Sequence, residues 1–191
     1  MTGYIFTTEN NWEPPLILLP TLRRALMGRP RGPWVRWVED NRPESFLWKT
    51  ADVSHELLLF AIECAEHVLP FSEKYYPMNH GPHLAVFAAR RVLENPSADN
   101  IVSAENFGRV GEFAPLGSTN RVYSAAAASA AFCRKPELAA HYSALYSAIG
   151  AWPPMDDKGK EFHLCFPNDE EIQWQTQRLD ELILPKLEIK P

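Results

Sequence analysis

Residues 52–91 read DVSHELLLFAIECAEHVLPFSEKYYPMNHGPHLAVFAARR, and this stretch decides the fold. In its first half, apolar side chains recur at every third or fourth position, which is the spacing of an amphipathic helix. Asp52 or Ser54 can cap the first turn of that helix. Pro70 has no amide to continue the hydrogen-bond ladder, so the sequence predicts that the helix stops there.

A second helix is predicted across PHLAVFAARRVLEN, residues 82–95. Its apolar residues again follow helical spacing, whereas Arg90 and Arg91 are expected to point outward. The positions predicted to be buried are Leu84, Ala85, Ala88 and Val92. A corner that contains proline, glycine and asparagine separates the two helices.

Four further helices are predicted, over residues 98–113, 118–133, 136–150 and 169–184. The alanine-rich segment that begins at Ser124 is expected at the centre of the bundle, because small side chains let neighbouring backbones come close. In the last two helices, larger apolar residues define the expected buried stripes: Leu138, Tyr142, Leu145 and Ile149 in one, and Ile172, Leu179, Leu182 and Ile183 in the other. Residues 51–191 are therefore predicted to form an all-α, compact bundle of about six helices.

Residues 1–50 are predicted to form an irregular arm, rich in proline and tryptophan, that packs on the helical body. Prolines interrupt every periodic window of this region before it reaches helix length. Residues 21–28 are compatible with one short helix. The piece GPWVRWVEDN, residues 32–41, is compatible with a short helix or, as the less favoured alternative, a strand. Trp34 and Trp37 are expected either to cover the body or to be exposed to a partner.

The composition limits the possible functions. The chain has 191 residues, 19 Lys and Arg against 24 Asp and Glu, and a formal charge of −5 at pH 7, which argues against a nucleic-acid-binding surface. No apolar run approaches the ~20 residues that span a bilayer, and no secretory signal is recognisable, so a cytoplasmic protein is expected. Cys64, Cys133 and Cys165 fit neither a disulfide framework nor a zinc motif and are expected to be buried thiols.

Glu56, Glu63 and His67 are the clearest candidates for a charged site, since they fall within about 40° of one another around the first helix. They are expected to form an acidic patch that faces solvent or a partner. The alternative is a metal site completed by His80 or His83, although the spacing is not that of an HExxH motif. The sequence has no phosphate-binding loop and no nucleophile motif, so neither catalytic residues nor cofactors are expected.

Five segments, taken in order, resemble the Imm-5-like family of immunity proteins. They are ECAEHVLPFSEKYYP, GPHLAVFAAR, the alanine-rich helix, AAHYSALYSAIGA and EIQWQTQRLDELILP, and they lie within residues 57–185. Members of that family are all-α, with a CAE-x-x-L helix, a proline-containing turn, alanine-rich central helices and a closing W-Q segment. The matching positions here are Cys64, Ala65, Glu66, Pro82, Arg90, Arg121, His141, Tyr146, Trp174 and Gln175.

The resemblance implies a bacterial cytoplasmic protein that binds and neutralises a protein toxin without catalysis. At the turn, this chain has Asn79, Gly81 and His83 where the family pattern has an aspartate and two arginines, so its partner surface would differ. The expected partner-binding residues are Glu56, Glu63, Glu66, His67, His83, Arg90, Trp34 and Trp37. No nucleic acid, membrane or cofactor is expected as a partner.

Two other functions remain open from the sequence. One is a helical metal-dependent enzyme that uses Glu56, Glu63 and His67, with His80 as a fourth metal ligand. The other is a small-molecule-binding helical protein whose pocket lies among the helices.

Overall fold

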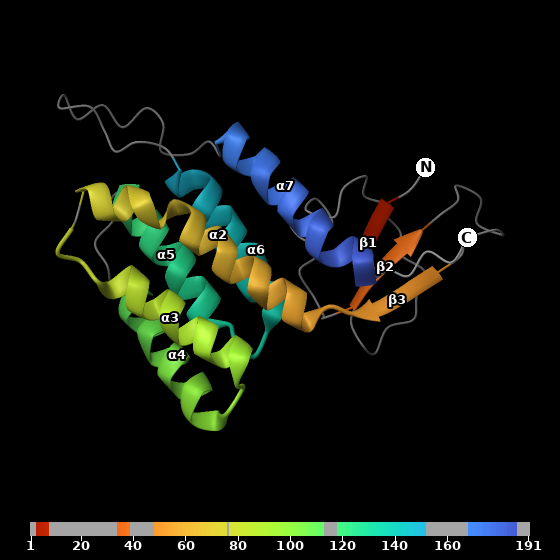
Figure 1. Cartoon of the computed structure of the whole chain (residues 1–191), viewed down its shortest axis with the longest axis horizontal. Coiled ribbons are helices and arrows are strands. Elements are labelled where there is room, and N and C mark those ends of the chain that lie inside the picture. The colour runs from red at the N-terminus through yellow and green to blue at the C-terminus, as the bar shows by residue number, and fades with distance from the viewer. Residues whose placement is uncertain are drawn as a thin grey trace.

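A computed structural model describes residues 3–7, 34–38, 48–75, 77–112, 118–151 and 168–186. Six α-helices make up the described body (Figure 1). They are α2 (Ser54–Tyr75), α3 (Gly81–Glu94), α4 (Ala98–Glu112), α5 (Ser118–Ala131), α6 (Pro136–Gly150) and α7 (Asp169–Ile183), followed by the 3₁₀ helix η2 (Leu184–Lys186). The prediction of an all-α bundle of about six helices is therefore confirmed. None of these helices combines the length and the apolar character needed to cross a bilayer.

Three short strands precede the helices in the chain. They are β1 (Gly3–Thr7), β2 (Trp34–Val38) and β3 (Trp48–Asp52), which pair antiparallel in the order β1-β2-β3. Trp37 lies opposite Tyr4 in β1 and Lys49 in β3. Residues 34–38 thus form the less favoured of the two predicted alternatives, consistent with the aromatic and β-branched content of WVRWV. The proposed helix at 21–28 lies outside the described residues, and the packing of the arm on the body stays a prediction.

The alanine-rich helix α5 lies at the centre of the bundle, where it contacts α2, α3, α4 and α6 (Figure 1). Ala125, Ala126 and Ala130 have no exposed surface. Small residues also bring α4 close, since a Cβ atom at Gly108 would lie 2.5 Å from the Cβ of Ala131. The predicted central position of this helix is confirmed.

Helix α6 buries a different side from the predicted one. Leu138, Tyr142, Leu145 and Ile149 are only partly buried, and the buried residues are Ala139, Ala140, Ser143, Ala144, Ser147, Ala148 and Gly150. The physical reason is close contact with α2, to which two serines are hydrogen-bonded. The Ser143 hydroxyl donates to the Ala61 carbonyl at 2.5 Å, and the Ser147 hydroxyl to the Cys64 carbonyl at 2.8 Å.

Helix α2 does not stop at Pro70 but continues to Tyr75, so the predicted end was wrong. Proline removes the hydrogen bond that its amide would donate to the carbonyl of Glu66, but the buried side chains on the same turns keep α2 helical beyond it. In α7, Leu179 and Ile183 are fully buried, as predicted, whereas Ile172 and Leu182 are partly buried.

Cys64 and Cys133 are buried, as predicted. Cys165 lies outside the described residues.

Candidate partner-binding surfaces

A charged seam joins α2 to the C-terminal helix α7. The Glu63 carboxylate accepts hydrogen bonds from Nε and Nη2 of Arg178, at 2.7 and 2.8 Å, and these bonds raise the pKa of the arginine above its ordinary value. At the other end of the seam, Nζ of Lys186 lies 3.0 Å from Oε1 of Glu56. Glu56 is 7% exposed, so the expectation of a solvated acidic patch is corrected here.

The third residue of that predicted patch, His67, also contacts α7. Its Nδ1 atom lies 2.6 Å from Oε2 of Glu171, and its ring stacks on Trp174 with centroids 3.9 Å apart. The Glu171 side chain is 2% exposed and also accepts a hydrogen bond from Gln175, whose amide donates to the Ala144 carbonyl of α6. Buried carboxylates require such partners, so these contacts fasten α7 to both α2 and α6.

The geometry does not support the metal alternative of Glu56, Glu63, His67 and His80. Glu56 and His67 are eleven residues apart on one helix, which separates them by roughly 16 Å at 1.5 Å per residue. Ligands of one zinc ion must all lie about 2 Å from it. Within the described ranges, no group of three or more His, Cys, Asp or Glu residues is placed to hold a metal ion.

A second set of charged contacts crosses from α2 to α3. Nε of Arg90 donates to Oε1 of Glu66 at 2.8 Å, and hydrogen bonding to this carboxylate raises the pKa of Arg90. Seven residues away along each helix, Nε2 of His83 lies 3.0 Å from Oε1 of Glu73. The two contacts therefore mark the two ends of a surface shared by α2 and α3.

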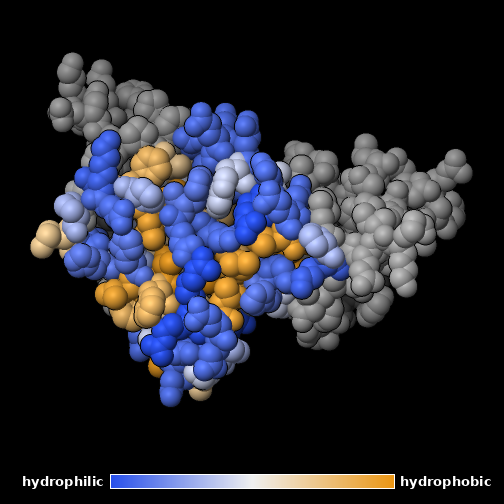
Figure 2. Space-filling view, in the orientation of Figure 1, coloured by the Kyte–Doolittle hydropathy of each residue, from blue (hydrophilic) through white to orange (hydrophobic). Residues whose placement is uncertain are grey.

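Apolar side chains occupy the middle of this surface. Pro70 lies four residues after Glu66 in α2, and Phe87, which is 62% exposed, lies four residues after His83 in α3. Figure 2 shows hydrophobic residues over the start of α3 with hydrophilic residues around them. We call this surface the Phe87 face and define it as Glu66, Pro70, Glu73, His83, Leu84, Phe87 and Arg90. An exposed aromatic inside a polar rim is typical of protein interfaces.

Leu84 belongs to this face because it is 46% exposed, and its predicted burial was wrong. Ala85, Ala88 and Val92 are buried as predicted. The buried side of α3 is thus made of residues small enough for close contact with α4 and α5, and Leu84 lies at its border. Arg91 points outward as predicted.

Gly81 fixes where the Phe87 face begins. A Cβ atom at this position would overlap the side chain of Tyr123 in α5, so any larger residue would have to displace that ring. Tyr123 is 8% exposed, and burial raises its pKa. His80 precedes the helix without a side-chain capping bond.

Comparison of the chain with protein-family models, with curated proteins and with solved structures finds no match. The resemblance to the Imm-5-like family therefore stays a prediction. Of the residues predicted to bind a partner, Glu66, His83 and Arg90 lie together on the Phe87 face; Glu56, Glu63 and His67 lie in the α2–α7 seam; Trp34 and Trp37 lie in β2. Phe87 itself was missed, because helical spacing alone does not reveal which apolar positions stay uncovered.

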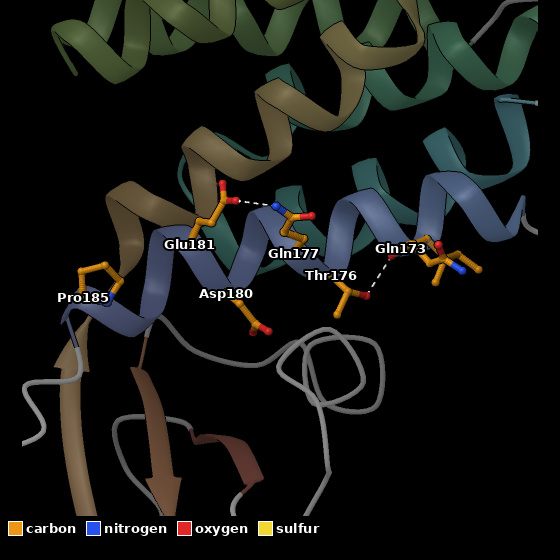
Figure 3. Close-up of a pocket in the computed structure, with 7 residues that line it drawn as sticks. Gln173, Thr176, Gln177, Asp180, Glu181 and Pro185 are labelled. Atoms are coloured by element: carbon orange, nitrogen blue, oxygen red, sulfur yellow. Dashed lines mark hydrogen bonds between the residues drawn. The ribbon is translucent and has the colours of Figure 1, made fainter.

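An open groove with a volume of about 710 Å³ lies along the other side of α7 (Figure 3), and we call it the α7 cavity. Its described lining is Ile172, Gln173, Thr176, Gln177, Asp180, Glu181 and Pro185. Oδ1 of Asp180 is buried and accepts no hydrogen bond within the described part of the chain, and burial raises the pKa of this carboxyl group. Amides, a hydroxyl and carboxylates at this cavity offer hydrogen bonds to a polar ligand.

Proposed function

We propose that this protein is a bacterial immunity-type protein, which binds a protein toxin in the cytoplasm and neutralises it by covering the toxin's active surface. The observation that carries the proposal is the Phe87 face, where a 62% exposed phenyl ring lies between the ion pairs Glu66–Arg90 and Glu73–His83.

The energetics of such a face favour binding. Full burial of a phenylalanine side chain contributes about 1.5–3 kcal/mol, and interface energy is concentrated in a few such anchors. The charged residues at the two ends would fix the orientation of the partner and reject partners of the wrong charge pattern. This function needs no catalytic residue in this chain.

The α2–α7 seam has a different role in this proposal. Its acids are already paired with Arg178 and Lys186, so a partner would have to break those contacts to reach them. We therefore assign Glu56, Glu63 and His67 to the stability of the bundle and the Phe87 face to recognition.

Growth protection tests the proposal. Bacteria that express each toxin encoded beside this gene are expected to grow when the wild-type protein is co-expressed. The Phe87→Asp variant should lose protection, because a charged group replaces the apolar anchor. Val102→Asp is the matched control, since Val102 is a 48% exposed apolar residue on α4, outside the Phe87 face. Failure of the wild-type protein against every neighbouring toxin would contradict the proposal.

A second candidate function is the binding of a small polar molecule in the α7 cavity. Oδ1 of Asp180, which is buried and has no hydrogen-bond partner among the described residues, supports it, because a cationic ligand such as a primary amine would satisfy this carboxylate. A screen of amines for an increase in melting temperature tests this function. The shift should disappear in Asp180→Asn, and the absence of a shift with any amine would count against it.

A further inference from the structure

Helix α7 lies outside the main core, which is the hydrophobic core that α2 to α6 share. Among the described residues, no member of the main core comes from α7. Leu179 and Ile183 are fully buried all the same. On α2, Phe60 is likewise fully buried outside the main core, and it lies on the side of the helix that carries Glu63 and His67. Helix α7 therefore covers a small second core of its own, along the outside of the bundle (Figure 1).

Half of the buried side chains of α7 are polar. Its buried residues are Glu171, Gln175, Leu179 and Ile183. The Glu171 carboxylate is bonded to His67 of α2, and the Gln175 amide donates to a carbonyl of α6. The ion pairs of Arg178 and Lys186 with acids of α2 complete the attachment. Water can replace each of these polar contacts when they break, so together they hold α7 less firmly than the same number of apolar side chains would.

The chain that joins α6 to α7 is much longer than the gap it has to bridge. The backbone amide of Asn168, at the start of α7, donates to the carbonyl of Ala148 in α6 at 2.7 Å. Residues 152–167 nevertheless supply sixteen positions between the two helices. An extended chain of that length spans roughly 50 Å, several times the diameter of a helix. The connection therefore allows α7 to leave the body without any other helix moving.

We propose that α7, together with η2, is a releasable strap, which leaves the body as one unit while α2 to α6 stay folded. Its release uncovers Phe60 between the acids Glu56 and Glu63 on α2. Proteins open in such cooperative units at free energies below that of global unfolding, and units with few buried apolar contacts open first. This motion belongs to the free protein and can be measured without any toxin, so it does not rest on the proposed function.

Amide hydrogen exchange of the full-length protein tests the release. The hydrogen-bonded amides of α7 are expected to be about a hundredfold less protected than those of α5 and to share one protection factor, because they open together. Helix α4 is the matched control, since it has 15 residues like α7 but contributes Ala104 to the main core. Its amides should be protected as those of α5 are. Equal protection of α7 and α4, or protection of α7 that declines steadily toward one end, would overturn the strap.

Two matched valine substitutions separate release of α7 from global unfolding. Ile62 belongs to the main core and lies on the opposite side of α2 from Phe60, whereas Ile183 is buried in α7. Ile62→Val should make the amides of α5 exchange about two- to tenfold faster and leave those of α7 unchanged, because the contacts of Ile62 persist when α7 leaves. Ile183→Val should accelerate exchange in both helices, because its contacts are lost in either opening. Equal acceleration of α7 and α5 in Ile62→Val would mean that α7 opens only when the whole protein unfolds.

Discussion

The guanidinium of Arg178 holds the carboxylate of Glu63 in a two-point hydrogen bond across 115 positions of the chain. The Glu63 side chain is only 18% exposed and that of Arg178 is 31% exposed. Water therefore screens this pair less than a surface pair, and its geometry is the planar fork that arginine forms with carboxylates. The contact fixes which side of α7 meets α2.

Removing one member of this pair should destabilise the protein measurably. Arg178→Met leaves the carboxylate of Glu63 largely desolvated without its partner, and we expect a loss of about 1–2 kcal/mol in the free energy of unfolding. Urea denaturation provides the measurement. The double variant with Glu63→Gln should lose less than the sum of the two single losses.

The matched control for that experiment is the ion pair of Arg134 and Glu105, whose arginine side chain is 58% exposed. Arg134→Met should cost less than about 0.5 kcal/mol, because exposed pairs contribute little. Equal losses of unfolding free energy in Arg178→Met and Arg134→Met would mean that the Glu63–Arg178 pair stabilises the protein no more than an exposed ion pair does.

A methyl group at Gly108 should also be costly. Its Cβ atom would lie 2.5 Å from the Cβ and 2.8 Å from the Cα of Ala131, and the backbone cannot yield as a flexible side chain would. We expect Gly108→Ala to lower the free energy of unfolding by about 1–3 kcal/mol and the melting temperature with it. The control is Ser103→Ala, a substitution at a partly exposed position of α4. Similar melting temperatures for both variants would contradict the close approach of α4 and α5.

The helical body could be predicted from the sequence because the spacing of apolar residues in α2 and α7 and the alanine content of α5 leave few alternatives. The orientation of α6 could not, because the prediction placed the largest apolar side chains inside. Its interior side is instead chosen by Ser143 and Ser147, whose hydroxyls reach the carbonyls of α2. Such bonds depend on which helices are neighbours, and a single sequence does not state that.

The charged residues likewise divide into a feature that the sequence predicts, which is their common side of the helix, and one that it does not, which is their partners. Angular spacing correctly grouped Glu56, Glu63 and His67, but it carries no information on distance along the helix axis or on what covers the group. The partners Arg178 and Lys186 lie more than a hundred residues away in sequence. Phe87 became a candidate only when its exposure was known, since an identical pattern with one more covering helix would have buried it.

Alkaline pH should reveal the burial of Cys133. Burial raises the pKa of its thiol to about 12, from an ordinary value near 9. Between these values the unfolded chain loses the proton while the folded protein retains it, so stability is complete below pH 9 and falls as the pH rises. Urea midpoints should thus fall less steeply above pH 9 in Cys133→Ala than in the wild type. Cys165→Ala serves as the control, and identical slopes in Cys133→Ala and the wild type would show that Cys133 is not responsible.

His67 offers the sharpest test of how α7 is fastened. Its Nδ1 bond to the buried carboxylate of Glu171 and its stack on Trp174 are separable, because His67→Phe keeps an aromatic ring for the stack and removes the bond. The buried carboxylate of Glu171 then keeps its hydrogen bond from Gln175 but loses the one to residue 67. We therefore expect His67→Phe to lower the free energy of unfolding, measured by urea denaturation, by about 2–3 kcal/mol. Adding Glu171→Gln removes the buried charge and should restore about half of that loss. If the double variant were instead less stable than His67→Phe alone, the cost would come from packing, and the polar bond would not be what holds α7 on α2.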